Sequence, residues 1–186
     1  MNQDPISKQW EKSELIFALA LIIIGVSARF LPHLPNFVPI TAIALFSGRY
    51  FSKKFSLAIP LSIMIISDFL LGFSIVTLFV YFGFLVAIIF GYLSRRSHRW
   101  QMIFGSAIAS SLFFYLITNF GVYISGNWYP HTAQGLVDCY LMAIPFFRFS
   151  LFGDLFYTTV IFGAYQFFTI YSRGKEISRE ALLVIK

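Results

Sequence analysis

Two aspartates lie within strongly apolar segments of the chain, and each needs a chemical explanation. Asp68 comes at the end of one apolar run, and Asp154 comes near the start of another. A carboxylate in an apolar medium is costly to bury unless it faces the protein interior and finds a partner. Arg29 and Arg148 are cations that could pair with the aspartates and lock helices together. The alternative interpretation is a pocket that holds a polar or charged small molecule.

Acid–base catalysis is a further possibility, because two carboxylates that share a proton form the dyad of aspartyl proteases. The local sequence speaks against it. Leu151 and Phe152 precede Gly153-Asp154, so the Gly-x-Gly-Asp pattern of intramembrane aspartyl proteases is incomplete, and Ser67 replaces the tyrosine expected before Asp68. No nucleophile elbow, His-Glu-x-x-His helix or glycine-rich phosphate loop occurs. We therefore expect a protein that is not an enzyme.

Metal binding finds no support in the spacing of the ligand types. His33 and His131 are far apart, and Cys139 is the single cysteine. These residues do not form a recognisable metal motif, and one cysteine excludes an intrachain disulfide. We expect no metal and no cofactor.

Composition identifies the medium that surrounds these polar groups. The 186 residues are 58% hydrophobic and 12% charged, and 24 are Phe. Soluble domains have about 25% charged residues, so too few polar side chains remain to cover a water-facing surface. The net charge of +6 is not accompanied by a nucleic-acid-binding signature. The chain is predicted to be an integral membrane protein that forms a single domain, 1–186, and does not bind nucleic acid.

Six apolar runs predict an all-α bundle of six transmembrane helices. Each crossing needs about 20 residues, and the second run is short, so it could instead be re-entrant. A cleavable signal peptide ending at Ala28 would leave five spans, but Glu11 and Glu14 are unusual in a signal. The expected spans are 15–31, 36–51, 55–71, 75–93, 102–124 and 149–171.

The basic residues select the orientation. With both termini in the cytoplasm, twelve of the fourteen Lys and Arg fall on the inner side, and only Arg29 and Arg148 fall outside. A re-entrant second run would move Arg49, Lys53 and Lys54 outside and weaken this asymmetry, which the positive-inside rule requires. We therefore expect six spans, N-in and C-in, in the cytoplasmic membrane.

The segment 132–147, between the fifth and sixth spans, has the pattern of an amphipathic helix. Its apolar residues recur at helical spacing, Thr132 is a suitable N-cap, and Pro145 comes near its end. We expect an interfacial helix that lies over the outer mouth of the bundle as a lid or a tether.

Rows of small residues let helices approach closely in lipid. They predict packing within the bundle or a docking face for another subunit. The rows are Ala44 and Gly48, then Gly83, Ala87 and Gly91, then Gly105 and Ala109.

This topology gathers the unusual polar residues in the outer half of the membrane or just above it, whereas the inner halves are apolar. That asymmetry favours capture of a small polar or anionic molecule at the outer face over a channel, which needs a continuous polar path. Tyr129 has an alternative role as an interface anchor. The candidate substrate-binding residues are Arg29, His33, Asn36, Asp68, Asn119, Tyr129, His131, Arg148 and Asp154.

Several ordered motifs resemble an uncharacterised family of small bacterial and algal membrane proteins, known as a domain of unknown function and described as candidate transport proteins. The resemblance covers about residues 29–163 and implies neither a known substrate nor catalytic residues. The motifs are Pro32-His33-Leu34-Pro35-Asn36-Phe37, Ser67-Asp68, Thr118-Asn119-Phe120-Gly121-Val122, Pro145-Phe146-Phe147 and Gly153-Asp154-Leu155.

The expected architecture is also similar to the substrate-binding S-components of energy-coupling-factor vitamin transporters. That similarity implies a vitamin-like substrate and an energising membrane or ATPase module as partner, besides the lipid bilayer. The Ala-x-x-x-Ala row typical of their first helix is absent, because Ile22 follows Ala18 four residues later. The leading hypothesis is a substrate-binding transport protein. The alternative is a non-catalytic structural or assembly subunit.

Overall fold

The computed structural model of the chain describes residues 5–32, 34–97 and 99–184, with side chains for 14–32, 34–97 and 99–171. The described residues form helices and connecting loops, with no strand among them, which confirms the all-α prediction. The elements are α1 (Pro5–Phe30), α2 (Ile40–Tyr50), α3 (Lys53–Leu71), α4 (Ile75–Leu93), the 3-10 helix η1 (Ser94–Arg96), α5 (Trp100–Ser125) and α6 (Ala133–Val184).

Four stretches of helix among the described residues are long and apolar enough to cross a membrane: Lys53–Leu71, Ile75–Arg96, Trp100–Ser125 and Ala133–Tyr171. Large apolar side chains such as Phe69, Leu78 and Phe167 are exposed on their outer faces. Extended apolar surface of this kind is unusual on a protein that faces water. The chain is therefore compatible with a multi-pass membrane protein.

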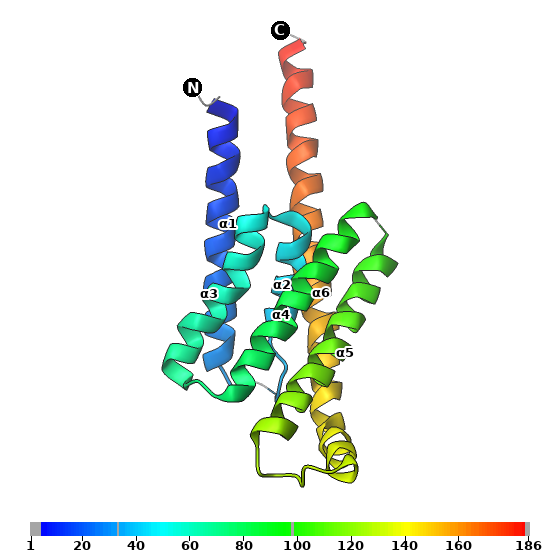
Figure 1. Ribbon diagram of the computed structural model, residues 1–186. Helices are drawn as coiled ribbons and strands as arrows, with labels where there is room; N and C mark the ends of the chain where they lie inside the picture. Colours follow the sequence, from blue (N-terminus) through cyan, green and yellow to red (C-terminus); the bar gives the residue numbers. More distant parts are fainter. Residues whose placement is uncertain (1–4, 33, 98, 185–186) are drawn as a thin grey trace.

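The helices form one bundle with both termini at the same end (Figure 1). The α2–α3 and α4–α5 connections lie toward that end, and the other three connections lie toward the opposite end. Helix α2 occupies the centre, in contact with the other five α-helices. Its residues Ile40 to Arg49 are all buried, so α2 is the core of the bundle.

Helix α2 differs from the predicted second span, 36–51. It has 11 residues, about 16 Å of helix, against a hydrocarbon core of about 30 Å. Residues 31–32 and 34–39 lie outside the helices instead. Pro39 disfavours helical backbone at the residue before it, and Asn36 has a left-handed φ of 60°, which Asn adopts more readily than most residues. The predicted helical bounds were therefore wrong at the amino-terminal side.

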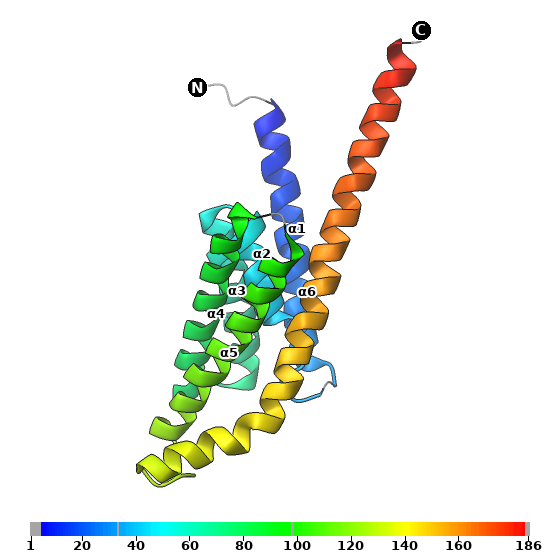
Figure 2. The same cartoon turned by 90° about the vertical axis from the view of Figure 1, so that its right-hand side faces the viewer.

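Helix α6 joins two elements that the sequence predicted as separate, 132–147 and 149–171. Pro145 lies inside one continuous helix, and the arm formed by residues 133–147 bends away from the rest (Figure 2). Prolines are tolerated in membrane helices when neighbouring groups satisfy the backbone. The N-cap prediction is confirmed, since the Gly135 N–H donates to the Thr132 hydroxyl at 3.1 Å. The helical backbone of α1 and α6 also extends into both predicted polar tails.

Close packing of α2 against α4 explains two of the rows of small residues. A Cβ on Gly48 would collide with the Ile88 carbonyl, and a Cβ on Gly91 would collide with the Leu45 carbonyl. In contrast, nothing lies within 4 Å of a Cβ added to Gly105. The Gly48 and Gly91 rows therefore pack within the bundle.

Two arginines join the carboxyl ends of α2 and α4 reciprocally. Arg49 of α2 donates to the backbone carbonyls of Ser94 and Ser97. Arg95 donates back to the carbonyls of Gly48 at 2.8 Å and Phe51 at 2.5 Å. Cations at helix carboxyl ends satisfy free carbonyls and oppose the helix dipole. These contacts fix the parallel α2–α4 pair whose amino-terminal half borders the candidate site.

Candidate functional site

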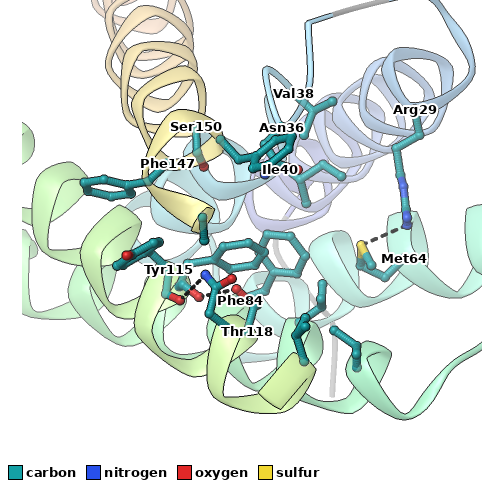
Figure 3. A pocket seen from close by; sticks show the side chains of 17 residues that line it. Arg29, Asn36, Val38, Ile40, Met64, Phe84, Tyr115, Thr118, Phe147 and Ser150 are labelled. Carbon is teal, nitrogen blue, oxygen red and sulfur yellow. Dashed lines mark hydrogen bonds between the residues drawn. The ribbon is translucent and has the colours of Figure 1, made fainter. Parts of the chain in front are cut away.

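A cavity of about 340 Å³ is lined by the side chains drawn in Figure 3. Asn36 and Val38 of its wall come from the connection between α1 and α2, which lies at the end of the bundle opposite to the termini (Figure 1). All six α-helices and the loop before α2 contribute to its wall. The lining residues are Arg29, Asn36, Val38, Ile40, Met64, Val76, Val80, Phe84, Phe114, Tyr115, Thr118, Asn119, Val122, Ala143, Phe146, Phe147 and Ser150.

Arg29 forms one side of the cavity and is held there by α3. Its Nη1 donates to Asp68 Oδ1 at 2.6 Å and to Ser67 Oγ at 2.7 Å, and it lies 3.2 Å from the sulfur of Met64. The Asp68 side chain is 3% exposed and the Arg29 side chain 21% exposed. All three contacts use Nη1, so among the described residues the other two nitrogens of the guanidinium have no hydrogen-bond partner.

Asp68 is placed by the end of α3. Gly72 stops the helix with a φ of 96°, which a residue without a Cβ adopts without strain. The second carboxylate oxygen of Asp68 and the hydroxyl of Tyr81 are both buried without a hydrogen-bond partner among the described residues. Arg29 and Asp68 thus connect α1 and α3 beside the cavity.

One face of α5 supplies the polar groups of the opposite wall. Tyr115, Thr118, Asn119 and Val122 recur at the spacing of a single helical face. The Asn119 amide nitrogen donates to the Tyr115 carbonyl at 2.7 Å, which leaves the side-chain oxygen to accept a bond from a ligand. The Tyr115 hydroxyl donates to the Tyr140 carbonyl at 2.6 Å and so attaches the bent arm of α6 to α5.

The structure brings together part of the predicted set. Arg29, Asn36 and Asn119 line the cavity, and Asp68 lies behind Arg29 as its ion-pair partner. His33 lies outside the described residues.

The other four predicted residues lie elsewhere. Arg148 is exposed and forms no ion pair with Asp154 in the described part of the chain. Asp154 is buried at 2% exposure and accepts a hydrogen bond from Ser111 at 2.5 Å, with Thr41 also within reach. Tyr129 and His131 line a shallow hollow in the α5–α6 loop.

Sequence reasoning missed most of the wall. Tyr115 and Thr118 could have been found from Asn119, because residues three and four positions apart share a helix face. Ser150 could have been found as the residue one turn before Asp154. The apolar members, such as Phe84 and Phe147, have no signal that distinguishes a cavity wall from ordinary packing.

The chemistry of the wall fits a small amphipathic molecule. Its volume is in the range of small-molecule sites, which combine a mostly apolar lining with a few placed polar groups. Here an ion-paired arginine, two amides and three hydroxyls face aromatic and aliphatic side chains. No group of three or more His, Cys, Asp or Glu side chains that could hold a metal occurs among the described residues.

A family model described as a family of unknown function, DUF6580, matches residues 9–176, which is most of the chain. This match confirms the predicted resemblance to an uncharacterised family. No curated protein and no solved structure matches the chain.

Proposed function

The chain belongs to the DUF6580 family of unknown function, and we propose that it is a membrane transport protein that captures a small molecule from the outer face. The substrate has an anionic or strongly polar group and an apolar body of about the size of a vitamin. The observation on which this rests is the 340 Å³ cavity, to which all six α-helices contribute. A cavity built by every helix is the expected place for a ligand in a helical membrane bundle.

The polar end of the substrate would lie between Arg29 and Asn119. The first residue of α2, Ile40, also lines the cavity. The amino terminus of a helix has a partial positive charge and free N–H groups. Together with Arg29 it favours an anionic or electron-rich group, while Phe84, Phe114 and Phe147 would contact the apolar body.

The orientation that we propose is N-in and C-in with six crossings, α2 being a short one enclosed by protein. The basic residues at the α2–α3 and α4–α5 connections lie toward the end that holds both termini, as the positive-inside rule requires of the cytoplasmic side. Non-helical backbone such as 34–39 is tolerated at membrane depth where it lines a cavity, and Asn36 and Val38 of this segment do so. The cavity then lies in the outer half.

The proposal is tested by mass spectrometry of small molecules released from gently purified protein. Wild type should yield a species that Asn119→Leu loses, because leucine removes the amide from the wall at similar volume. Asn127→Leu, in the exposed loop, is the matched control and should retain it. A released species that is equally abundant in all three proteins, or absent from wild type, would contradict capture in this cavity.

A structural or assembly subunit is the second candidate function. It is favoured by the Arg29–Asp68 pair and the buried Asp154 contacts, which connect helices without any ligand. An energising membrane or ATPase module, implied by the similarity to S-components, is a further prediction. Co-purification of such a module with wild type would support it.

A further inference from the structure

A second polar cluster, formed by Thr41, Ser111 and Asp154, lies next to the cavity, within one helical turn of residues that line it. On α6, Ser150 lines the cavity, and Asp154 follows Ser150 by one turn. On α5, Tyr115 lines the cavity, and Ser111 precedes Tyr115 by one turn. On α2, Ile40 lines the cavity, and Thr41 is the next residue. The same three helices therefore form both part of the cavity wall and the surroundings of the Asp154 carboxyl.

The Asp154 carboxyl is deeply buried, and no cation among the described residues forms an ion pair with it. Its side chain is 2% exposed, and its described partners are the hydroxyls of Ser111 and Thr41. An isolated ionised carboxylate in such a place is strongly disfavoured, and the group then takes its neutral form. Neutral hydroxyl partners do not replace a counter-charge.

In the part of the chain that the structure describes, the charged and titratable groups of α2, α5 and α6 have other surroundings. On α2, Arg49 lies at the far end and binds the carbonyls of Ser94 and Ser97. On α5, Tyr115 donates its hydroxyl to the Tyr140 carbonyl. On α6 itself, Arg148 is exposed, and the ring of Tyr157 packs against Phe37.

The hydrogen count at Ser111 allows two arrangements, because the serine hydroxyl can donate either to Asp154 or to the Ala107 carbonyl. The Ser111 Oγ lies 3.0 Å from the Ala107 carbonyl oxygen and 2.5 Å from Asp154 Oδ2. A serine hydroxyl has one hydrogen, and a backbone carbonyl can only accept. If the serine hydrogen goes to Ala107, the proton in the shorter contact belongs to Asp154.

We propose that Asp154 is a proton-binding site, protonated in the resting protein, whose deprotonation opens the α2–α5–α6 junction toward the cavity. In that step the carboxyl O–H bond breaks and the proton passes to water. The carboxylate that remains must be hydrated, and the nearest space for water is the cavity one turn away. Thr158, one turn further along α6, is fully buried with an unpartnered hydroxyl among the described residues, so it offers the next hydrogen-bonding position.

Infrared spectroscopy of the purified protein tests the protonation directly. Wild type at neutral pH should show a carboxylic acid C=O band that disappears in Asp154→Asn. Asp138→Asn, which changes an aspartate in the outer arm of α6, should leave the band unchanged. If Asp154→Asn does not fold, Ser111→Ala keeps the carboxyl but removes its shortest hydrogen bond, and the band must then shift. A band that is insensitive to Asp154→Asn and Ser111→Ala would overturn the proposal.

Cavity accessibility tests the second half of the proposal. In a Cys139→Ser background, Ser150→Cys places a thiol on the cavity wall, and its labelling rate is measured at each pH with Asp154 present and in the Asp154→Asn variant. The rate with Asp154 is divided by the rate in the variant. This ratio cancels the titration of the thiol itself. We expect a ratio near one at acidic and neutral pH that rises several-fold at alkaline pH as Asp154 loses its proton. A ratio that is independent of pH would overturn the linkage, and neither readout requires the substrate to be known.

Discussion

Arg29 has two functions at the residue scale, because it neutralises Asp68 and also lines the cavity. Removing one member of a buried ion pair leaves an uncompensated charge, whereas replacing both members often restores stability. The Arg29–Asp68 pair, 2.6 Å apart, therefore allows its contribution to folding to be separated from its contribution to binding.

A double-mutant cycle makes this separation. Arg29→Met alone should lower the free energy of unfolding by about 3 kcal/mol, because Asp68 remains buried without a partner. Adding Asp68→Asn should recover most of that loss, measured by thermal denaturation in detergent. The double variant should still fail to retain the co-purifying ligand. If the stable double variant retains the ligand at wild-type occupancy, Arg29 has a structural role alone.

The sequence placed Arg29, Asn36 and Asn119 correctly at one end of the bundle, since topology determines depth. It did not determine the direction in which each side chain points around its helix. Arg148 and Asp154 are six residues apart, so they lie about 120° apart around the axis of a regular helix. That angle explains why the structure exposes Arg148 while it buries Asp154. The depth of a residue follows from its position along a helix, whereas its contacts also depend on the direction in which its side chain points around the helix axis.

At the scale of elements, the close contact between α2 and α4 joins two helices that both line the cavity. The backbones approach so closely at Gly91 that a Cβ would collide with the Leu45 carbonyl. Small residues at this spacing were recognised in the sequence, but their partner was not, because the spacing alone does not say which helix packs there. The central place of α2 was also beyond prediction, since an apolar helix can face protein or lipid.

Glycine substitutions test the importance of this contact. Gly91→Ala should force α2 and α4 apart and lower the free energy of unfolding by about 1–3 kcal/mol, as overpacking does. Gly105→Ala is the matched control, because nothing lies within 4 Å of the added Cβ, and it should be neutral or slightly stabilising. Equal thermal stability of the two variants would contradict the close α2–α4 contact.

At the scale of the whole molecule, the six crossings that we propose rest on the distribution of charge rather than on helix length. Length and hydropathy identify four helices, and α2 is too short to be identified in this way. The sequence predicted six spans from its apolar runs, and the loop charges favoured a full crossing over a re-entrant second run. It predicted a break in α6, since proline usually ends a helix in water.

Cysteine labelling in intact cells tests the orientation. In a Cys139→Ser background, Asn127→Cys in the α5–α6 loop should react with a membrane-impermeant maleimide. Ser97→Cys, after η1, should react only after the membrane is permeabilised. The opposite pattern would reverse the orientation and place the cavity toward the cytoplasm.

The central claim is that the cavity holds a small molecule, and native mass spectrometry of a cavity-filled variant tests it most directly. Ala143 lines the cavity, so Ala143→Phe should fill part of the space and reduce ligand occupancy by about tenfold or more, a loss of at least 1.4 kcal/mol. Ile108→Phe adds a ring on the exposed face of α5 and controls for nonspecifically bound lipid. We predict a bound species of defined mass in wild type and Ile108→Phe that is lost from folded Ala143→Phe. Equal occupancy in all three proteins would contradict a binding site in this cavity.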